Sequence, residues 1–163
     1  MRTVKFKGQK PSNGAWAYGS LVYLDENGAA IYVQTDNGSE KVMDLVYVVP
    51  DTVCQFTGFL DKNGKEIYEG DVLRSDEYPY SCIGDKKRDN YYAVVYYCEE
   101  GACFGTVTAK NPSSDVGGIS DGILDDVERE KMKKFEVVGN IHEEKWQQYG
   151  EYFKNEEKEA DND

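Results

Sequence analysis

The feature that most constrains the fold of this chain is an alternation of apolar and polar residues, interrupted by short turns that contain Asp, Asn and Gly. In the segment TVKFK, Val4 and Phe6 point to one side of an extended chain, and the lysines between and after them point to the other. Comparable β-type segments cover residues 15–24, 29–34, 41–49, 91–98, 105–110 and 134–141. The pattern predicts an all-β, mainly antiparallel fold in which β-hairpins build compact barrel-like or SH3-like halves.

Two of the turns lie in nearly the same sequence context. LDENGAAIY (24–32) and LDKNGKEIY (60–68) share six of nine residues at an offset of 36. Each matches a hairpin in which Asp begins the turn and Gly takes a left-handed φ. Two unrelated hairpins would explain the shared turn residues, whereas two equivalent stacked units would also explain the shared Leu, Ile and Tyr.

The second of these segments continues into EGDVL (69–73). A Gly-Asp step before an apolar strand is typical of a chain that turns a corner, because Gly relieves the backbone and Asp accepts hydrogen bonds from nearby amides. Asp61, Glu69 and Asp71 could also gather into an acidic cluster. Because carboxylates are favoured turn residues, we interpret them as structural caps.

The remaining segments do not have a period of two. Residues 75–90 and 111–122 are rich in Asp, Ser, Gly, Pro and Asn, and they predict long loops. Residues 124–134 contain helix formers and predict one short helix. Its inward side would carry Leu124, Val127 and Met132. Helical spacing near the C-terminus predicts a last amphipathic turn with an aromatic packing face of Trp146, Tyr149 and Phe153.

We expect a single β domain over residues 1–153, with two barrel-like subdomains at about 1–50 and 51–145. Residues 154–163 are predicted to be a disordered acidic tail. No apolar run reaches the roughly 18–20 residues of a membrane span, and the first residues do not resemble a secretory signal. A protein of the host-cell cytoplasm, without a membrane partner, is therefore expected.

No catalytic, cofactor-binding or metal site is predicted. The four cysteines are Cys54, Cys82, Cys98 and Cys103, and no two of them have the C-x-x-C spacing of a typical zinc site, so reduced thiols are favoured over zinc. The single histidine, His142, lies at the end of a predicted strand without a partner motif and is interpreted as structural or surface-exposed. Because no nucleophile or phosphate-binding motif is present either, an enzyme is not expected.

Two blocks of the sequence resemble the YopX family of phage and prophage proteins: VVPDTVCQFTGFLDKNGKEIYEGDVL (48–73) and FEVVGNIHEE (135–144). Cys54, Phe59 and Glu144 depart from the residues usual in that family, which are Gly, Leu and Asn. The resemblance extends over residues 1–145, apart from the two predicted loops. It implies an all-β fold with barrel-like halves and an origin in phage or mobile-element genomes, and it brings no established activity and no catalytic residues.

The favoured function is therefore a phage accessory protein that acts as a non-enzymatic protein-interaction or self-assembling module. A homo-oligomer, or an unidentified phage or host protein, is the expected partner, because exposed tyrosine pairs on strands would promote such contacts. Those pairs are Tyr91-Tyr92 and Tyr96-Tyr97. The net charge of −12 favours a basic partner.

The alternative function is nucleic-acid binding by a small barrel through a local basic and aromatic patch. The residues that could form this patch are Arg2, Lys5, Lys7, Lys10, Lys86, Lys87 and Arg88, with Tyr91 and Tyr92. The net charge of −12 disfavours this alternative, because an acidic body repels phosphates.

Overall fold

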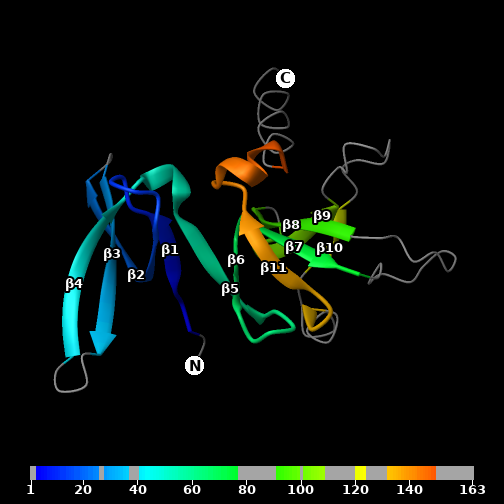
Figure 1. The fold of residues 1–163 in the computed structure, drawn as a ribbon, viewed down its shortest axis with the longest axis horizontal. Coiled ribbons are helices and arrows are strands. Elements are labelled where there is room, and N and C mark those ends of the chain that lie inside the picture. The colour runs from blue at the N-terminus through cyan, green and yellow to red at the C-terminus, as the bar shows by residue number, and fades with distance from the viewer. Residues whose placement is uncertain are drawn as a thin grey trace, which may run out of the picture. The chain divides into compact units, whose positions relative to one another are not determined.

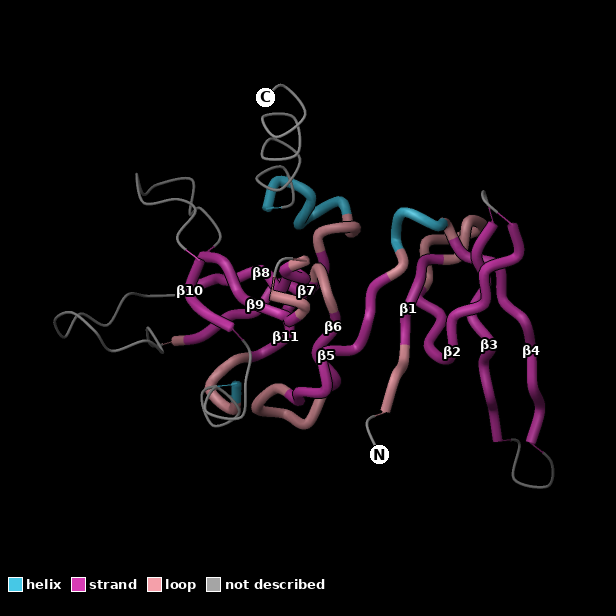
Figure 2. The backbone as a smooth tube through the Cα atoms, turned by 180° about the vertical axis from the view of Figure 1, so that it is seen from behind, coloured by secondary structure: helices cyan, strands magenta, loops and turns pink. Residues whose placement is uncertain are grey.

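The computed structural model describes residues 3–25, 28–36, 41–76, 91–99, 101–108, 120–123 and 132–149. Its strands pair in antiparallel fashion (Figures 1 and 2). The chain divides into two compact units, Met1–Gly58 and Phe59–Asp163, which are called unit 1 and unit 2 below.

Unit 1 is built on the β4-β3-β2-β1-β5 part of a six-stranded sheet, in which β6 (Glu66–Tyr68) pairs with β5. Its elements are β1 (Phe6–Gln9), β2 (Trp16–Asp25), β3 (Gly28–Asp36), β4 (Lys41–Val48), the 3-10 helix η1 (Pro50–Thr52) and the first part of β5 (Cys54–Leu60). The long strands β2, β3 and β4 lie side by side as successive hairpins (Figure 1). These strands agree with the alternation predicted over 15–24, 29–34 and 41–49.

The core of unit 1 lies on one face of this sheet. It consists of Ala17, Ala29, Ile31 and Val48, with Phe6, Leu21, Val33, Val46 and Val53 packed against them. The sheet curls so that the end of β4 returns to β1, where the Val49 N–H donates to the Gln9 carbonyl oxygen at 2.9 Å. Gly8 permits this approach, because a Cβ there would lie 2.9 Å from Val48.

Unit 2 holds a second sheet with the strand order β10-β9-β8-β7-β11. Its elements are the end of β5, β6 (Glu66–Tyr68), β7 (Asp71–Ser75), β8 (Tyr91–Cys98), β9 (Cys103–Thr108), β10 (Ser120–Ile123), β11 (Glu136–Asn140) and η2 (Glu144–Trp146). The central strand β8 is buried on both faces. Ala93 and Val95 join one apolar cluster, while Val94 joins another, which explains its continuous apolar sequence.

The predicted all-β, mainly antiparallel fold is confirmed. The prediction of barrel-like halves is wrong in one respect, because neither sheet closes into a barrel within the described residues. Strand β10 begins at Ser120, so it takes up the last three residues of the loop predicted at 111–122. Of the predicted helix at 124–134, the structure describes only residues 132–134, and Met132 is buried as expected. Leu124, Val127, Phe153 and residues 154–163 lie outside the described residues.

The two similar nine-residue segments join their strands at different spacings. In the first, Asp25 pairs with Gly28 at the ends of β2 and β3. In the second, residues 61–65 separate β5 from β6, and Gly64 has a φ of +79°. Ile31 and Ile67 are both buried, yet Tyr32 is exposed and Tyr68 is buried. The segments are therefore both hairpins, but they are not equivalent units.

No helix in the described part of the chain is long and apolar enough to cross a membrane.

Candidate functional site

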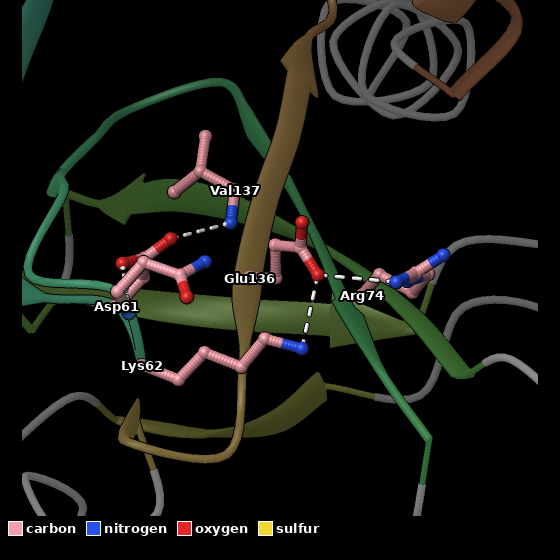
Figure 3. Close-up of polar contacts among 6 residues, drawn as sticks. Asp61, Lys62, Arg74, Glu136 and Val137 are labelled. Atoms are coloured by element: carbon pink, nitrogen blue, oxygen red, sulfur yellow. Dashed lines mark hydrogen bonds and ion pairs between the residues drawn. The ribbon is translucent and has the colours of Figure 1, made fainter.

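The Asp61 carboxylate organises the turn between β5 and β6. One oxygen, Oδ1, accepts hydrogen bonds from the backbone N–H groups of Asn63 (2.7 Å) and Lys65 (2.9 Å). The other, Oδ2, accepts from the N–H of Val137 on β11 at 3.0 Å (Figure 3). Asp61 is only 4% exposed. Both oxygens are used by the backbone, as expected for a cap rather than a ligand site.

Asp71 and Asn140 form a second buried polar connection. Asp71 accepts hydrogen bonds from the Tyr68 N–H (2.8 Å) and from the Asn140 side-chain amide (3.0 Å). The same amide donates to the Glu69 carbonyl oxygen, and the Ile141 N–H donates to the Gly70 carbonyl oxygen. Gly70 has a φ of +71°, and a Cβ there would lie 3.1 Å from the Asn140 amide nitrogen.

Ion pairs strengthen the contact between the first turn and β11. Lys62 Nζ lies 2.9 Å, and Arg74 Nη2 3.1 Å, from the same oxygen of Glu136, as Figure 3 shows. The Lys62 ammonium, which donates a hydrogen bond to Glu136 and lies beside it, lowers the pKa of this carboxyl, and Arg74 adds to the effect.

These contacts show what the two sequence blocks do. Residues 61–71 belong to the first block and residues 136–141 to the second. Hydrogen bonds inside the fold join the two blocks to each other. The interpretation of Asp61 and Asp71 as structural caps agrees with this geometry. Glu69 contributes its backbone carbonyl to the network. These residues stabilise the fold of unit 2 and form no open acidic cluster.

Among the other candidate ligands that the structure describes, Cys98 and Cys103 are cross-strand partners on β8 and β9. No group of three or more His, Cys, Asp and Glu side chains among the described residues could hold a metal ion. Cys54 is buried and its thiol donates to the Thr52 carbonyl oxygen, while Cys82 lies outside the described residues. The His142 backbone N–H donates to Asn140 Oδ1 where β11 ends.

The expectation that both tyrosine pairs are exposed is wrong for three of the four residues. Tyr91 is buried against Phe135, with ring centroids 6.1 Å apart. Tyr92 packs against Trp146 (6.0 Å) and Tyr149 (6.1 Å), and burial raises the pKa of the Tyr149 hydroxyl. The predicted packing role of Trp146 and Tyr149 is thereby confirmed.

The ring of Tyr96 covers Gly105, where a Cβ would lie 2.8 Å from the ring. Of the two pairs, only Tyr97 is exposed. Three of the tyrosines that the sequence suggested as contacts for a partner therefore pack inside unit 2 instead.

Two lysines of the predicted basic patch, Lys5 and Lys7, lie over aromatic rings. Lys7 is only 5% exposed, and its ammonium lies 4.4 Å from the centre of the Trp16 ring. The Lys5 ammonium lies 5.7 Å from the centre of the Phe56 ring. Arg2, Lys86, Lys87 and Arg88 lie outside the described residues.

The side of the unit 1 sheet on which Lys7 lies opposite Tyr18 also carries exposed apolar side chains. The strand register aligns Tyr32 of β3 with Leu45 of β4 and with Ser20 of β2, and it aligns Gln34 with Met43 and Ala30 with Tyr47. Alternation places these side chains opposite the core, together with Tyr18 and Val22. We call this side of the sheet the aromatic face. It consists of Tyr18, Ser20, Val22, Ala30, Tyr32, Gln34, Met43, Leu45 and Tyr47, of which Ala30 is completely buried.

Five large side chains of the aromatic face are exposed, and Tyr47 is the most exposed of them, at 63%. They are Tyr18, Tyr32, Met43, Leu45 and Tyr47. None of the nine residues is charged, although the chain contains 31 acidic and 19 basic residues. Contiguous exposed apolar surface of this kind typically marks an interaction site. The sequence did not reveal this surface because alternation alone does not show which side of a strand faces the core.

The model of the YopX protein family matches residues 5–145. This chain belongs to the YopX family. A search of curated proteins found no match. Among solved structures, the chain is similar to the crystal structure of protein EF1440 from Enterococcus faecalis, at 16% sequence identity and a TM-score of 0.48, covering 90% of this chain and 99% of that chain.

Proposed function

We propose that this YopX-family chain is a non-enzymatic interaction module of phage or prophage origin that acts in the cytoplasm of the host cell. Its aromatic face binds a second copy of the same chain. The observation that carries this proposal is the row of exposed apolar side chains on three neighbouring strands. The phage origin is supported by the family resemblance of the two sequence blocks.

Charge favours this face as the contact between two copies. Each copy carries a net charge of −12, so two copies repel each other over most of their surfaces. A stable contact between them needs a region that contains few carboxylates, and the nine residues of the aromatic face contain none. The expectation of a basic partner came from the net charge of the whole chain, and the uncharged aromatic face instead suits an apolar surface.

The size of the face is compatible with weak self-association. Five large side chains, each roughly half exposed, offer on the order of 500 Å² in one copy, taking about 150–250 Å² for a whole side chain. Two copies packed through these faces would bury about 1,000 Å², which is near the lower limit for a specific interface. A two-fold axis would bring the same residues of both copies together.

Nucleic-acid binding is less well supported. The ammonium groups of Lys5 and Lys7 lie over aromatic rings of their own unit, and Lys7, which pairs with Tyr18 of the aromatic face, is only 5% exposed. Affinity for phosphates depends on local positive charge. We therefore expect no binding of labelled oligonucleotides in fluorescence anisotropy at about 50 and 200 mM salt, the range over which true phosphate contacts weaken steeply.

Sedimentation velocity over a range of protein concentrations tests the self-association. The natural chain should shift towards a dimer as its concentration rises, and the double variant Leu45→Thr/Tyr47→Thr should stay monomeric. Tyr97→Thr is the matched control, because it removes an exposed tyrosine from unit 2 and should behave like the natural chain.

A natural chain that stays monomeric at every concentration would refute a second copy as the partner. Capture from phage-infected host cells, with the natural chain and the double variant as paired baits, would then test a phage or host protein on the same face. A partner retained equally by both baits would argue against the aromatic face.

A further inference from the structure

We propose that Cys98 and Cys103 form a dithiol that low-molecular-weight disulfides oxidise reversibly to an intramolecular disulfide at the end of the β8–β9 hairpin. This inference is independent of the proposed function, because it concerns a different unit of the chain. It assigns a modification site to two residues that take no part in the apolar clusters of unit 2.

The strand register brings the two cysteines together. Cys98 is the last residue of β8, Cys103 is the first residue of β9, and they are direct cross-strand partners. Directly opposite residues in an antiparallel pair have Cα atoms about 4.5–5.5 Å apart, and disulfides span about 4.4–6.8 Å between Cα atoms. The backbone therefore already has a spacing that a disulfide accepts.

The sulfur atoms lie on the same side of the turn. The position that a Cβ of Gly101 would occupy is 2.9 Å from the Cys103 sulfur and 3.5 Å from the Cys98 sulfur. Both sulfurs thus lie next to the same point, which a side chain at position 101 would occupy. Glycine keeps this space open, so the sulfurs can approach each other by side-chain rotation.

Both thiols are free and half-buried, so small reagents can reach them. Cys54, by contrast, is buried and lies in unit 1. Accessibility and an adjacent resolving thiol distinguish reactive cysteines from inert buried ones. This contrast makes Cys54 the internal control for the pair.

The oxidation is a thiol–disulfide exchange with glutathione disulfide as the probe. One thiolate of the pair attacks a sulfur of glutathione disulfide, which forms a mixed disulfide and releases one glutathione thiolate. The second thiolate then attacks the protein sulfur of the mixed disulfide, forms the Cys98–Cys103 bond and releases the second glutathione. The protein pair loses two electrons and two protons, and one glutathione disulfide becomes two glutathione thiols.

Trypsin makes the test specific, because cleavage after Arg88 and Lys110 yields the peptide 89–110, which contains Cys98 and Cys103 and no other cysteine. The folded protein is incubated with glutathione disulfide, alkylated with iodoacetamide, digested and analysed by mass spectrometry. The peptide should carry no alkyl group and should lack the mass of two hydrogen atoms. Dithiothreitol before alkylation should restore two alkyl groups.

Single variants give a second, positive signature. In Cys98→Ser or Cys103→Ser the resolving thiol is gone, so the peptide should retain one glutathione on the remaining cysteine. Cys54→Ser should behave like the natural chain. The proposal would be overturned by a natural peptide that carries two alkyl groups or two glutathiones after oxidation, or by a disulfide to Cys54 or Cys82.

Discussion

Replacing Asp61 with alanine tests whether the first sequence block is structural. The carboxylate accepts three backbone hydrogen bonds, and the one from Val137 is buried. A buried donor left without a partner costs about 1–3 kcal/mol, and each of the two part-buried bonds in the turn contributes about 0.5–1.5 kcal/mol. The expected loss of unfolding free energy is therefore about 2–6 kcal/mol, a large part of a typical total of about 5–15 kcal/mol.

Urea unfolding followed by tryptophan fluorescence would measure this loss. The free energy of unfolding of Asp61→Asn should lie between those of Asp61→Ala and the natural chain. The asparagine amide keeps one acceptor oxygen but turns a donor towards the backbone N–H groups. Asp44→Asn is the control, since Asp44 is exposed on β4 and should change stability by less than about 0.5 kcal/mol. A loss below about 1 kcal/mol for Asp61→Ala would refute the structural reading.

Two further predictions concern unit 2, and a third concerns the cysteines. Gly64→Val should lower the free energy of unfolding in urea by about 1–3 kcal/mol. The φ of Gly64 is +79° and the new side chain would meet open space, so backbone strain alone determines this loss. Equal stability of the variant and the natural chain would contradict the assignment. The pKa of Glu136 is lowered from 4.5, so its stabilising contribution is complete above that pH and disappears as the pH falls through the lower folded value. The natural chain should therefore lose more stability than Glu136→Gln between about pH 5 and 3, and parallel pH profiles would refute the ion pairs. Chelators should leave the melting temperature unchanged, and stoichiometric zinc in the purified protein by metal analysis would contradict the expected reduced thiols.

The fold class could be predicted from the sequence because period-two alternation is a local property. The register of β3 and β4, for example, follows the alternation of residues 29–34 and 41–49. The role of Asp61 as a cap was also predictable, because Asp, Asn and Gly at fixed spacing determine a turn locally. Its bond to Val137, 76 residues away, was not predictable, since it depends on which strand lies next to the turn.

The candidate surface was harder to predict. Tyr91 and Tyr92 resemble an exposed pair in the sequence, but β8 is buried on both faces, which single-strand patterns do not reveal. Conversely, Tyr32 and Tyr47 resemble core residues, but the core of unit 1 uses the small and branched residues between them, such as Ile31 and Val48. Which face of a strand becomes the core depends on how the sheet curls.

The most direct test of the interaction account is the unfolding free energy of Leu45→Thr/Tyr47→Thr in the isolated protein. Both side chains are exposed on the aromatic face, and threonine suits a strand, so the account predicts a change of less than about 1 kcal/mol at concentrations where the chain is monomeric. A loss above about 2 kcal/mol would show that the chain itself uses these side chains for stability, and it would contradict a face that is available to a second copy.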